Sequence, residues 1–380
     1  MTTDQSDPNP SGGEGAVSRR TVVGASVGGI GAAAAVGLTT AAIWPDTETA
    51  AAPASTAGSS NGSSGSADAG AGDSGTSGAT IDFTAAPGDG WEARDPAAPP
   101  TPAETVHRID IRATEIPGEV APGVSQQLWT FDDTVPGKTY RGKLGDQFIF
   151  TLTNDGDIAH SIDFHASKVN WDGPMRSINP GESLEYAFEA KHAGIFMYHC
   201  GTPPVLHHIG AGMHGAVIID PPDLAPVDHE FVMVQSEYYL GPEGEVGELS
   251  KMQKDQWDAV VFNGYVNQYQ HSPIRVDVNQ RIRIWVQDNG PSENSSFHVI
   301  GTIFDTVFKE GAYRLRPGSG QGGAQALDLQ PAQGGFVEFT FDVEGFYPFV
   351  THKFSSASIG ALGLFQCGDV ELPESAAGGH

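Results

Sequence analysis

The stretch GDQFIFTLTN at residues 145–154 shows the pattern that decides the fold of this chain. It is a short run rich in Phe, Ile, Leu and Thr that begins at a glycine and ends at an asparagine. Similar runs recur from about residue 100 to residue 370, and no long stretch among them has helical periodicity. Apolar runs between Gly, Pro, Asn and Asp are typical of strands. The sequence therefore predicts an all-β fold.

The same pattern occurs twice. In the first copy, residues 145–154 are followed by His160 and then by AGIFMYH, which ends at His199. In the second copy, NQRIRIWVQD at 279–288 is followed by His298 and then by EGFYPFVTH, which ends at His352. A repeat of about 140 to 150 residues has the size of one β-sandwich domain. We expect two tandem Greek-key sandwiches, at 99–222 and 223–370, and a C-terminal tail at 371–380.

The N-terminal part of the chain has the composition of an export signal and a linker. Arg19 and Arg20 precede a Gly/Ala-rich uncharged segment, which is the pattern of a twin-arginine signal. We expect this signal to cover residues 1–52 and a flexible Gly/Ser/Ala-rich linker to cover 53–98. The protein is then exported to the periplasm or the cell surface. The alternative is an uncleaved signal that anchors the chain in the membrane.

Charge and cysteine content exclude several classes of function. The net charge is −27, from 47 acidic and 20 basic side chains, so a nucleic-acid partner would be repelled. A solvated acidic surface is the simplest interpretation of this excess. The two cysteines, Cys200 and Cys367, are too few for a disulfide framework. We interpret Cys367 as a structural or free thiol.

Residues that bind metals gather in the first copy of the repeat. A thiolate, two imidazoles and a weak axial thioether form a blue-copper electron-transfer site. Cys200, His208 and Met213 follow one another closely, and His160 comes from an earlier strand. A lone Cys or Met is more often a core residue. The combination of all four predicts a copper site.

Strand geometry predicts a second metal site beside the first. Adjacent side chains on a strand point to opposite faces. If the segment IFMYHC is a strand, Cys200 points into the sandwich and His199 points out of it. The same alternation separates His160 from Asp163 and His165. We therefore expect a buried set around Cys200 and an outer set formed by Asp163, His165 and His199.

The outer set needs a third imidazole from elsewhere, because two histidines are too few to close it. The second copy of the repeat supplies His298 and His352. It has Lys353 at the position of Cys200, so we expect no blue-copper site there. A histidine kept on the outward face predicts a ligand shared across a domain or subunit interface. The alternative is a hydrogen-bonded core histidine.

Five motifs resemble those of copper-containing nitrite reductases, which belong to the multicopper oxidase superfamily. They are HSIDFH at 160–165, YHC at 198–200, HIGAGMHG at 208–215, FHVIG at 297–301 and VTH at 350–352. The resemblance covers about residues 105–367. It implies two cupredoxin domains per subunit, a homotrimeric ring, and about two coppers per subunit.

The resemblance also implies a role for each site residue. The residues that match the type 1 copper ligands are His160, Cys200, His208 and Met213. Those that match the type 2 ligands are His165 and His199 of one subunit and His352 of its neighbour. Asp163 and His298 match the pair that handles protons over bound nitrite, and Ile300 matches an apolar residue of that pocket. We selected His208 over the adjacent His207 because its spacing to Met213 fits the family.

The implied activity is dissimilatory reduction of nitrite to nitric oxide. The electron passes from the type 1 site through Cys200 and His199, and a small donor protein, a cupredoxin or a c-type cytochrome, supplies it.

Two other functions stay open. A laccase-like two-domain multicopper oxidase would reduce oxygen, but it needs His-x-His and His-Cys-His patterns, and the 13 histidines of this chain form neither. A type 1 copper electron carrier would explain the buried set alone. Copper content separates the three, with about two, four and one per subunit respectively.

Overall fold

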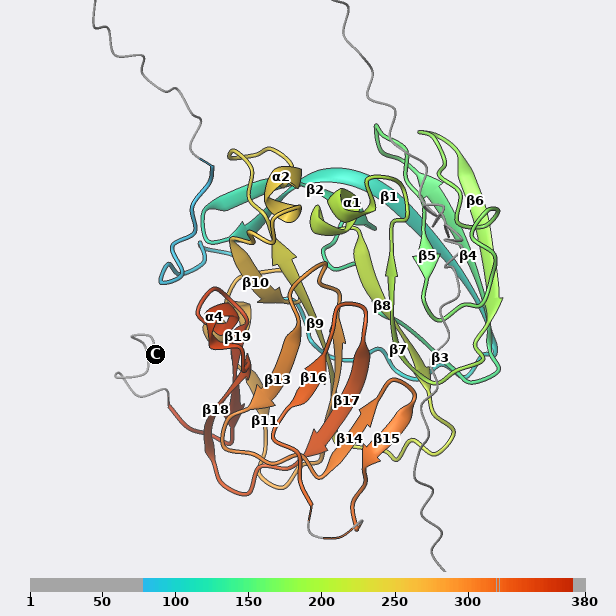
Figure 1. Cartoon of the computed structure of the whole chain (residues 1–380). Coiled ribbons are helices and arrows are strands. Elements are labelled where there is room, and N and C mark those ends of the chain that lie inside the picture. The colour runs from blue at the N-terminus through green and yellow to red at the C-terminus, as the bar shows by residue number, and fades with distance from the viewer. Residues whose placement is uncertain (1–77, 319, 321, 372–380) are drawn as a thin grey trace, which may run out of the picture. The chain divides into compact units, whose positions relative to one another are not determined.

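Strands dominate the computed structural model, which describes residues 78–318, 320 and 322–371 (Figure 1). The predicted signal at 1–52, the linker as far as residue 77 and the tail from residue 372 lie outside the described residues. The helices in the described part are short: α1 (Val205–Gly210), α2 (Leu249–Met252), α3 (Gln268–His271) and α4 (Phe354–Ala357). None of them is long and apolar enough to cross a membrane.

The first sandwich consists of two four-stranded sheets, ordered β2-β1-β4-β6 and β3-β8-β7-β5. Its strands are β1 (Val106–Ala121), β2 (Val124–Phe131), β3 (Tyr140–Lys143), β4 (Gln147–Asn154), β5 (Asp163–Phe164), β6 (Ser183–Glu189), β7 (Gly194–His199) and β8 (His214–Asp220). Phe148 and Phe150 of one sheet share a core with Phe164 and Tyr198 of the other. Their side chains alternate inward along each strand, which is why the pattern at 145–154 predicts a sandwich strand.

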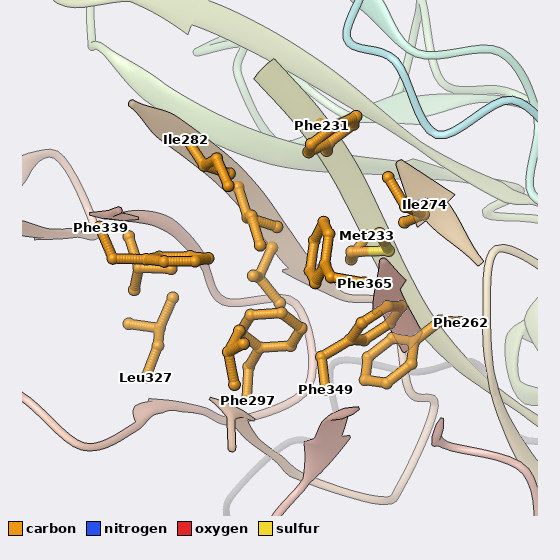
Figure 2. Close-up of a cluster of buried hydrophobic side chains, with 14 of the residues drawn as sticks. Phe231, Met233, Phe262, Ile274, Ile282, Phe297, Leu327, Phe339, Phe349 and Phe365 are labelled. Carbon is orange, nitrogen blue, oxygen red and sulfur yellow. The ribbon is translucent and has the colours of Figure 1, made fainter. Parts of the chain in front are cut away.

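The second sandwich has a six-stranded sheet, β10-β9-β12-β17-β14-β15, and a five-stranded sheet, β11-β19-β18-β13-β16. Its strands are β9 (His229–Tyr238), β10 (Ala259–Phe262), β11 (Ile274–Val276), β12 (Ile282–Asp288), β13 (Ser295–Val299), β14 (Thr306–Lys309), β15 (Ala312–Leu315), β16 (Leu327–Leu329), β17 (Gly334–Phe339), β18 (Gly345–Thr351) and β19 (Leu362–Cys367). Figure 2 shows its core, in which Ile282 and Phe339 of the six-stranded sheet lie near Phe297 and Phe365 of the other.

The predicted all-β architecture of two cupredoxin-like sandwiches is confirmed. Strands up to Asp220 belong to the first sandwich, and strands from His229 onward belong to the second. The predicted bounds, 99–222 and 223–370, stay predictions at the level of single residues.

Strand β8 holds the two sandwiches together because both of its faces are buried. Val217 and Ile219 point into the first core. Ala216 and Ile218 point the other way and pack against a second-sandwich cluster that contains Trp285. Burial on both faces explains why β8 is a continuous apolar run rather than an alternating one.

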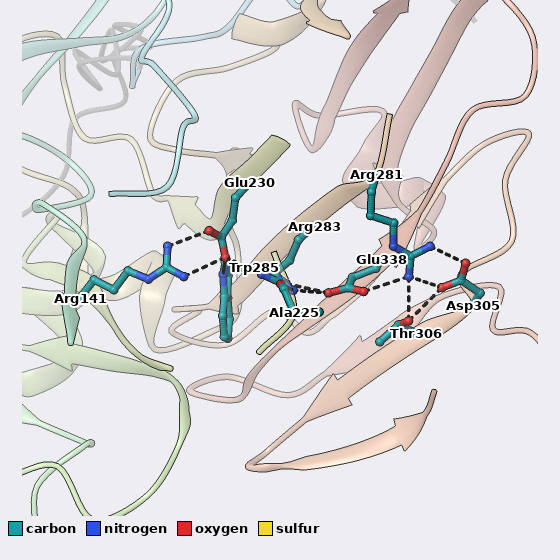
Figure 3. Close-up of polar contacts among 9 residues, drawn as sticks. All are labelled: Arg141, Ala225, Glu230, Arg281, Arg283, Trp285, Asp305, Thr306 and Glu338. Carbon is teal, nitrogen blue, oxygen red and sulfur yellow. Dashed lines mark hydrogen bonds and ion pairs between the residues drawn. The ribbon is translucent and has the colours of Figure 1, made fainter. Parts of the chain in front are cut away.

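Charged residues also cross between the sandwiches (Figure 3). Arg141 on β3 donates to both carboxylate oxygens of Glu230 on β9, at 2.8 and 3.0 Å. Glu230 also accepts from Arg283 and Trp285, and Arg283 continues to Glu338. Leaving one partner of a buried ion pair without the other destabilises a protein by about 3–5 kcal/mol. Any docking of the two sandwiches that separated Arg141 from Glu230 would carry this cost, so the network favours the observed arrangement.

Residues 78–98 pack against the sandwiches, although the sequence predicts a flexible linker over 53–98. Ile81 and Phe83 pack on a hydrophobic cluster formed by β1, β2, β9 and β10. The Trp91 ring lies 5.0 Å from that of Tyr265, and the Ala98 N–H donates to the Glu230 carbonyl. Part of the predicted linker is therefore packed, because a few apolar side chains and the Arg94 guanidinium, which donates to the Pro136 and Gly137 carbonyls, find partners on the folded surface.

Candidate metal centre

His160, Cys200 and His208 meet inside the first sandwich. One ligand atom from each lies within 4.8 Å of the others, and all three residues are buried. Nδ1 of His160 and Nε2 of His208 have no hydrogen-bond partner, although buried polar atoms normally have one. Met213 is fully buried in the same cluster as Cys200, and its carbonyl accepts the Cys200 N–H at 3.1 Å. Unpartnered imidazole nitrogens beside a thiol are a donor set that fits copper.

Burial keeps the imidazoles of this set neutral. It lowers the pKa of His208 to about 4, and it also lowers the pKa of His160. A metal must displace the protons of its ligands, so neutral imidazoles bind copper without that cost. Burial raises the pKa of the Cys200 thiol, while the N–H of Ser161 points at its sulfur from 3.3 Å.

Helix α1 separates the roles of two adjacent histidines. His208 donates through Nδ1 to the Pro204 carbonyl and joins the buried set. His207 instead donates to the carbonyl of Gly247, 2.9 Å away in a loop of the second sandwich. The Trp129 ring lies 4.7 Å from both imidazoles. The structure therefore places His208, the residue selected from the sequence, beside Cys200.

Asp163, His165 and His199 form a second group, again with one ligand atom from each within 4.8 Å. The Nε2 atoms of His165 and His199 are 3.0 Å apart. His199 donates through Nδ1 to the Cys200 carbonyl at 2.9 Å, which leaves its Nε2 free to face His165. His165 is exposed in the single chain, yet partial desolvation by the protein around its ring and the neighbouring His199 lower its pKa. Two facing imidazole nitrogens fit a metal ion, and the Asp163 carboxylate lies 3.9 Å from His199.

Cys200 and His199 point to opposite faces, as the alternation predicts. Cys200 is fully buried, whereas the His199 side chain is 13% exposed. Strand β7 ends at His199 rather than at Cys200, and β5 holds only Asp163–Phe164, so the strands are shorter than expected. His160 lies before β5 and forms an isolated bridge with Ile178.

The second-sandwich residues lie together on their own. The rings of His298 and His352 are 5.4 Å apart. His298 donates through Nδ1 to the Gln325 carbonyl, and Ile300 is exposed. Within the described residues of one chain, neither histidine joins the group around His199.

Strand register corrects one pairing in the repeat. Phe164 lies opposite Tyr198, and Phe297 lies opposite Thr351. His298, which follows Phe297, therefore corresponds to His165, whereas the order of histidines along the sequence pairs it with His160. That order misleads because the second copy has Glu293 at the position of His160, so its first histidine after the strand is the equivalent of His165.

Comparison with known proteins identifies the family. Residues 112–224 match the model of a family described as multicopper oxidase. A copper-containing nitrite reductase of Neisseria gonorrhoeae is 32% identical over 278 residues, 70% of this chain and 70% of that protein. This chain belongs to the copper-containing nitrite reductase family. Members of this family are copper-dependent oxidoreductases, and the predicted resemblance is confirmed.

Solved structures agree with this family. A copper nitrite reductase from Nitrosomonas europaea has a TM-score of 0.64 and 33% sequence identity, and it covers 71% of this chain and 96% of its own. A solved multicopper oxidase is also similar, with a TM-score of 0.61 and 28% identity over 76% of this chain and 98% of its own. The fold is therefore shared by nitrite reductases and oxidases, and the choice between these reactions depends on the site.

Some contacts in this member of the nitrite reductase family have no signal in its motifs. Glu115 binds His160, Ser161 approaches Cys200, and Gln325 binds His298. Glu115 lies on β1, far from His160 in the sequence, and Ser161 and Gln325 act through backbone groups. The sequence does not single out Glu115, because Asp110 and Glu119 lie in the same strand-like segment.

Proposed function

We propose that this chain reduces nitrite to nitric oxide and water, consuming one electron and two protons. The observation that carries the proposal is the pair of donor sets that meet at one peptide bond. Cys200 belongs to the buried set and His199 to the outer set. An electron that enters at the buried set can reach the outer set along the covalent bonds that join the adjacent residues Cys200 and His199.

The buried set corresponds to a type 1 site and the outer set to a type 2 site. The type 1 ligands are His160, Cys200, His208 and Met213. Copper would supply a one-electron centre at the type 1 set, and at the type 2 set a Lewis acid with an open position for an anion. His165 and His199 would hold this metal, and no thiolate belongs to their set.

Asp163 and His298 deliver the protons in this proposal. The Asp163 carboxyl belongs to the outer set and lies 3.9 Å from His199, where it would contact an oxygen of nitrite held by these histidines. The Gln325 carbonyl fixes Nδ1 of His298 as a donor, which leaves Nε2 to exchange protons through water. Ile300 supplies an apolar wall of the pocket. These roles need His298 and Asp163 to meet, and among the described residues of one chain His298 is not part of the group that contains Asp163.

We propose that the third type 2 ligand, His352, comes from a neighbouring subunit of a homotrimer. Support comes from the incomplete outer set, which has two imidazoles in the described residues, and from the His298–His352 pair that lies apart from it. A metal site shared between subunits needs one half-site from each of two chains.

Subunit mixing tests this shared site. His199→Ala and His352→Ala trimers are each expected to lose type 2 copper and nitrite reduction. Trimers reassembled from a mixture of the two variants regain both, because some interfaces pair an intact His199 with an intact His352. Reassembled trimers of either variant alone are the control. A mixture that stays inactive although its trimers contain both chains would show that His199 and His352 of different subunits do not form one site, and would reject the shared site.

We also propose export by the twin-arginine pathway and a small electron-donor protein, a cupredoxin or a c-type cytochrome. The support is the Arg19-Arg20 motif and the buried one-electron set. A fusion of residues 1–52 to a reporter that is active only outside the cytoplasm tests whether this segment directs export. The reporter is expected to be active in the fusion and inactive in the Arg19→Lys/Arg20→Lys control.

Nitric oxide production tests the main proposal. Copper-loaded protein with a reduced donor is expected to form nitric oxide from nitrite, with about two coppers per chain. The same sample is offered oxygen in a parallel assay, because the similar multicopper oxidase makes that reaction the second candidate. Oxygen uptake with no nitric oxide, at full copper occupancy, would reject nitrite reduction.

A further inference from the structure

Glu115 on β1 contacts the imidazole of His160 directly. Its carboxylate accepts a hydrogen bond from Nε2 of His160 at 2.8 Å, and the two side chains are 10% and 0% exposed. It also accepts the backbone N–H groups of Asp157 at 2.7 Å and Ile158 at 3.3 Å. One carboxylate thus holds both the imidazole and the loop that leads to it.

The bond to Glu115 decides which nitrogen of His160 faces the buried set. With Nε2 donating to Glu115, Nδ1 is the only ring nitrogen left, and it has no partner. A histidine that binds a metal usually donates its other N–H to a carboxylate or carbonyl, which orients the ring and makes it a stronger donor. The geometry around His160 has this form.

The second sandwich shows what this glutamate does where no metal set is present. Register places Asn154 opposite Ala113 and Asp288 opposite Gln235, so Glu115 and Glu237 stand at equivalent positions two residues further along. Glu237 likewise accepts backbone N–H groups from the following loop, those of Ser292 and Glu293. Holding the loop is therefore common to both sandwiches.

What differs is the residue that the loop presents. Glu293 stands four residues before Phe297, as His160 stands four before Phe164, the two phenylalanines being equivalent in register. Lys353 follows His352 as Cys200 follows His199, and Lys353 forms an ion pair with Glu293. The second sandwich thus has an ion pair where the first has an imidazole and a thiol. Only in the first sandwich does the glutamate bind a candidate ligand.

We propose that Glu115 is a positioning residue for the type 1 site. Its carboxylate orients His160 with Nδ1 toward Cys200 and strengthens the imidazole as a donor to oxidised copper, which lowers the reduction potential of the site. This inference rests on the proposed function only in taking the buried set to hold copper.

Glu115→Gln tests the inference because it keeps the size of the side chain and removes its charge. We expect affinity for type 1 copper to fall about 10- to 100-fold, measured by competition with a chelator. The reduction potential is expected to rise, and the copper hyperfine splitting in electron paramagnetic resonance is expected to change. Glu115→Asp, which restores the charge, should return the potential toward that of the unmodified chain.

Two control variants separate this role from loop holding and from charge. Glu237→Gln removes the equivalent loop contacts in the second sandwich. Glu119→Gln removes a carboxylate from the same strand, one that binds Gly123 and Tyr265 instead. Both are expected to leave the type 1 spectrum and potential unchanged.

The outcomes distinguish this inference from the proposed function. If Glu115→Gln matches both controls in copper affinity, potential and spectrum, Glu115 only holds the loop and the inference is wrong. If the unmodified chain binds copper without a thiolate-to-copper absorption band, the type 1 assignment itself fails and the inference falls with it. A normal type 1 site in a chain that does not reduce nitrite, together with the expected Glu115→Gln effects, supports the inference and rejects only the reaction.

Discussion

Replacing Cys200 by serine is expected to lower donor-driven nitrite reduction by about 1000-fold or more. Losses of this size are usual when one member of a group of residues that work together in catalysis is removed. The hydroxyl of serine does not replace a thiolate as a copper ligand, so the buried set loses its strongest donor. The outer set keeps His165 and His199 and should retain its metal. Copper analysis should show a loss of about one copper per chain, and steady-state nitric oxide production measures the rate.

Cys367 provides the matched control, because it is the other buried cysteine and lies on β19 in the second-sandwich core. Cys367→Ser removes a buried thiol without touching either donor set. We expect it to retain both coppers and most of the activity, with some loss of thermal stability. If Cys200→Ser reduces nitrite as fast as Cys367→Ser does, electrons do not enter through the buried set.

Replacing Asp163 by asparagine is expected to lower kcat by about 100- to 10,000-fold, the usual contribution of general acid–base catalysis. Asparagine keeps the size and hydrogen bonding of the side chain but has no carboxyl proton to give. Copper content should not change, because His165 and His199 still face one another. Measuring kcat and KM for nitrite, with metal analysis on the same sample, separates proton delivery from binding.

Asp172→Asn is the control for Asp163, because it removes a carboxylate from an exposed loop of the same sandwich. We expect its kcat to equal that of the unmodified chain. Two other results for Asp163→Asn would contradict proton delivery by Asp163. If this variant loses the outer copper, the carboxylate is a ligand. If it keeps the kcat of the unmodified chain, the protons come from another group.

Features that depend on neighbouring residues could be predicted from the sequence. The alternation of side chains separates Cys200 from His199: Cys200 packs in the first core although β7 ends at His199, and His199 belongs to the outer set. The spacing to Met213, compared with the family that the sequence resembles, selected His208 over His207, and His208 lies beside Cys200. Both features depend on one continuous segment at a time, and the copper role of His208 stays a prediction.

Features that depend on contacts between separate segments could not be predicted. The equivalence of His298 with His165 rests on which residues lie opposite one another in a sheet, and the order of histidines hides it because Glu293 stands where the first copy has His160. The packing of residues 78–98 depends on a surface formed by β1, β2, β9 and β10. The Gly, Ala and Pro content of this segment suggests a linker and says nothing about that surface.

The sequence by itself determined the fold class, the metal, and the two faces on which His199 and Cys200 lie, because residue type and strand alternation are local properties. Tertiary structure alone decided that Glu115 holds the Nε2 of His160. It also decided that His352 stays outside the outer set of its own chain. These contacts join residues from separate strands, and only the packing of the two sheets and the two sandwiches sets their distances.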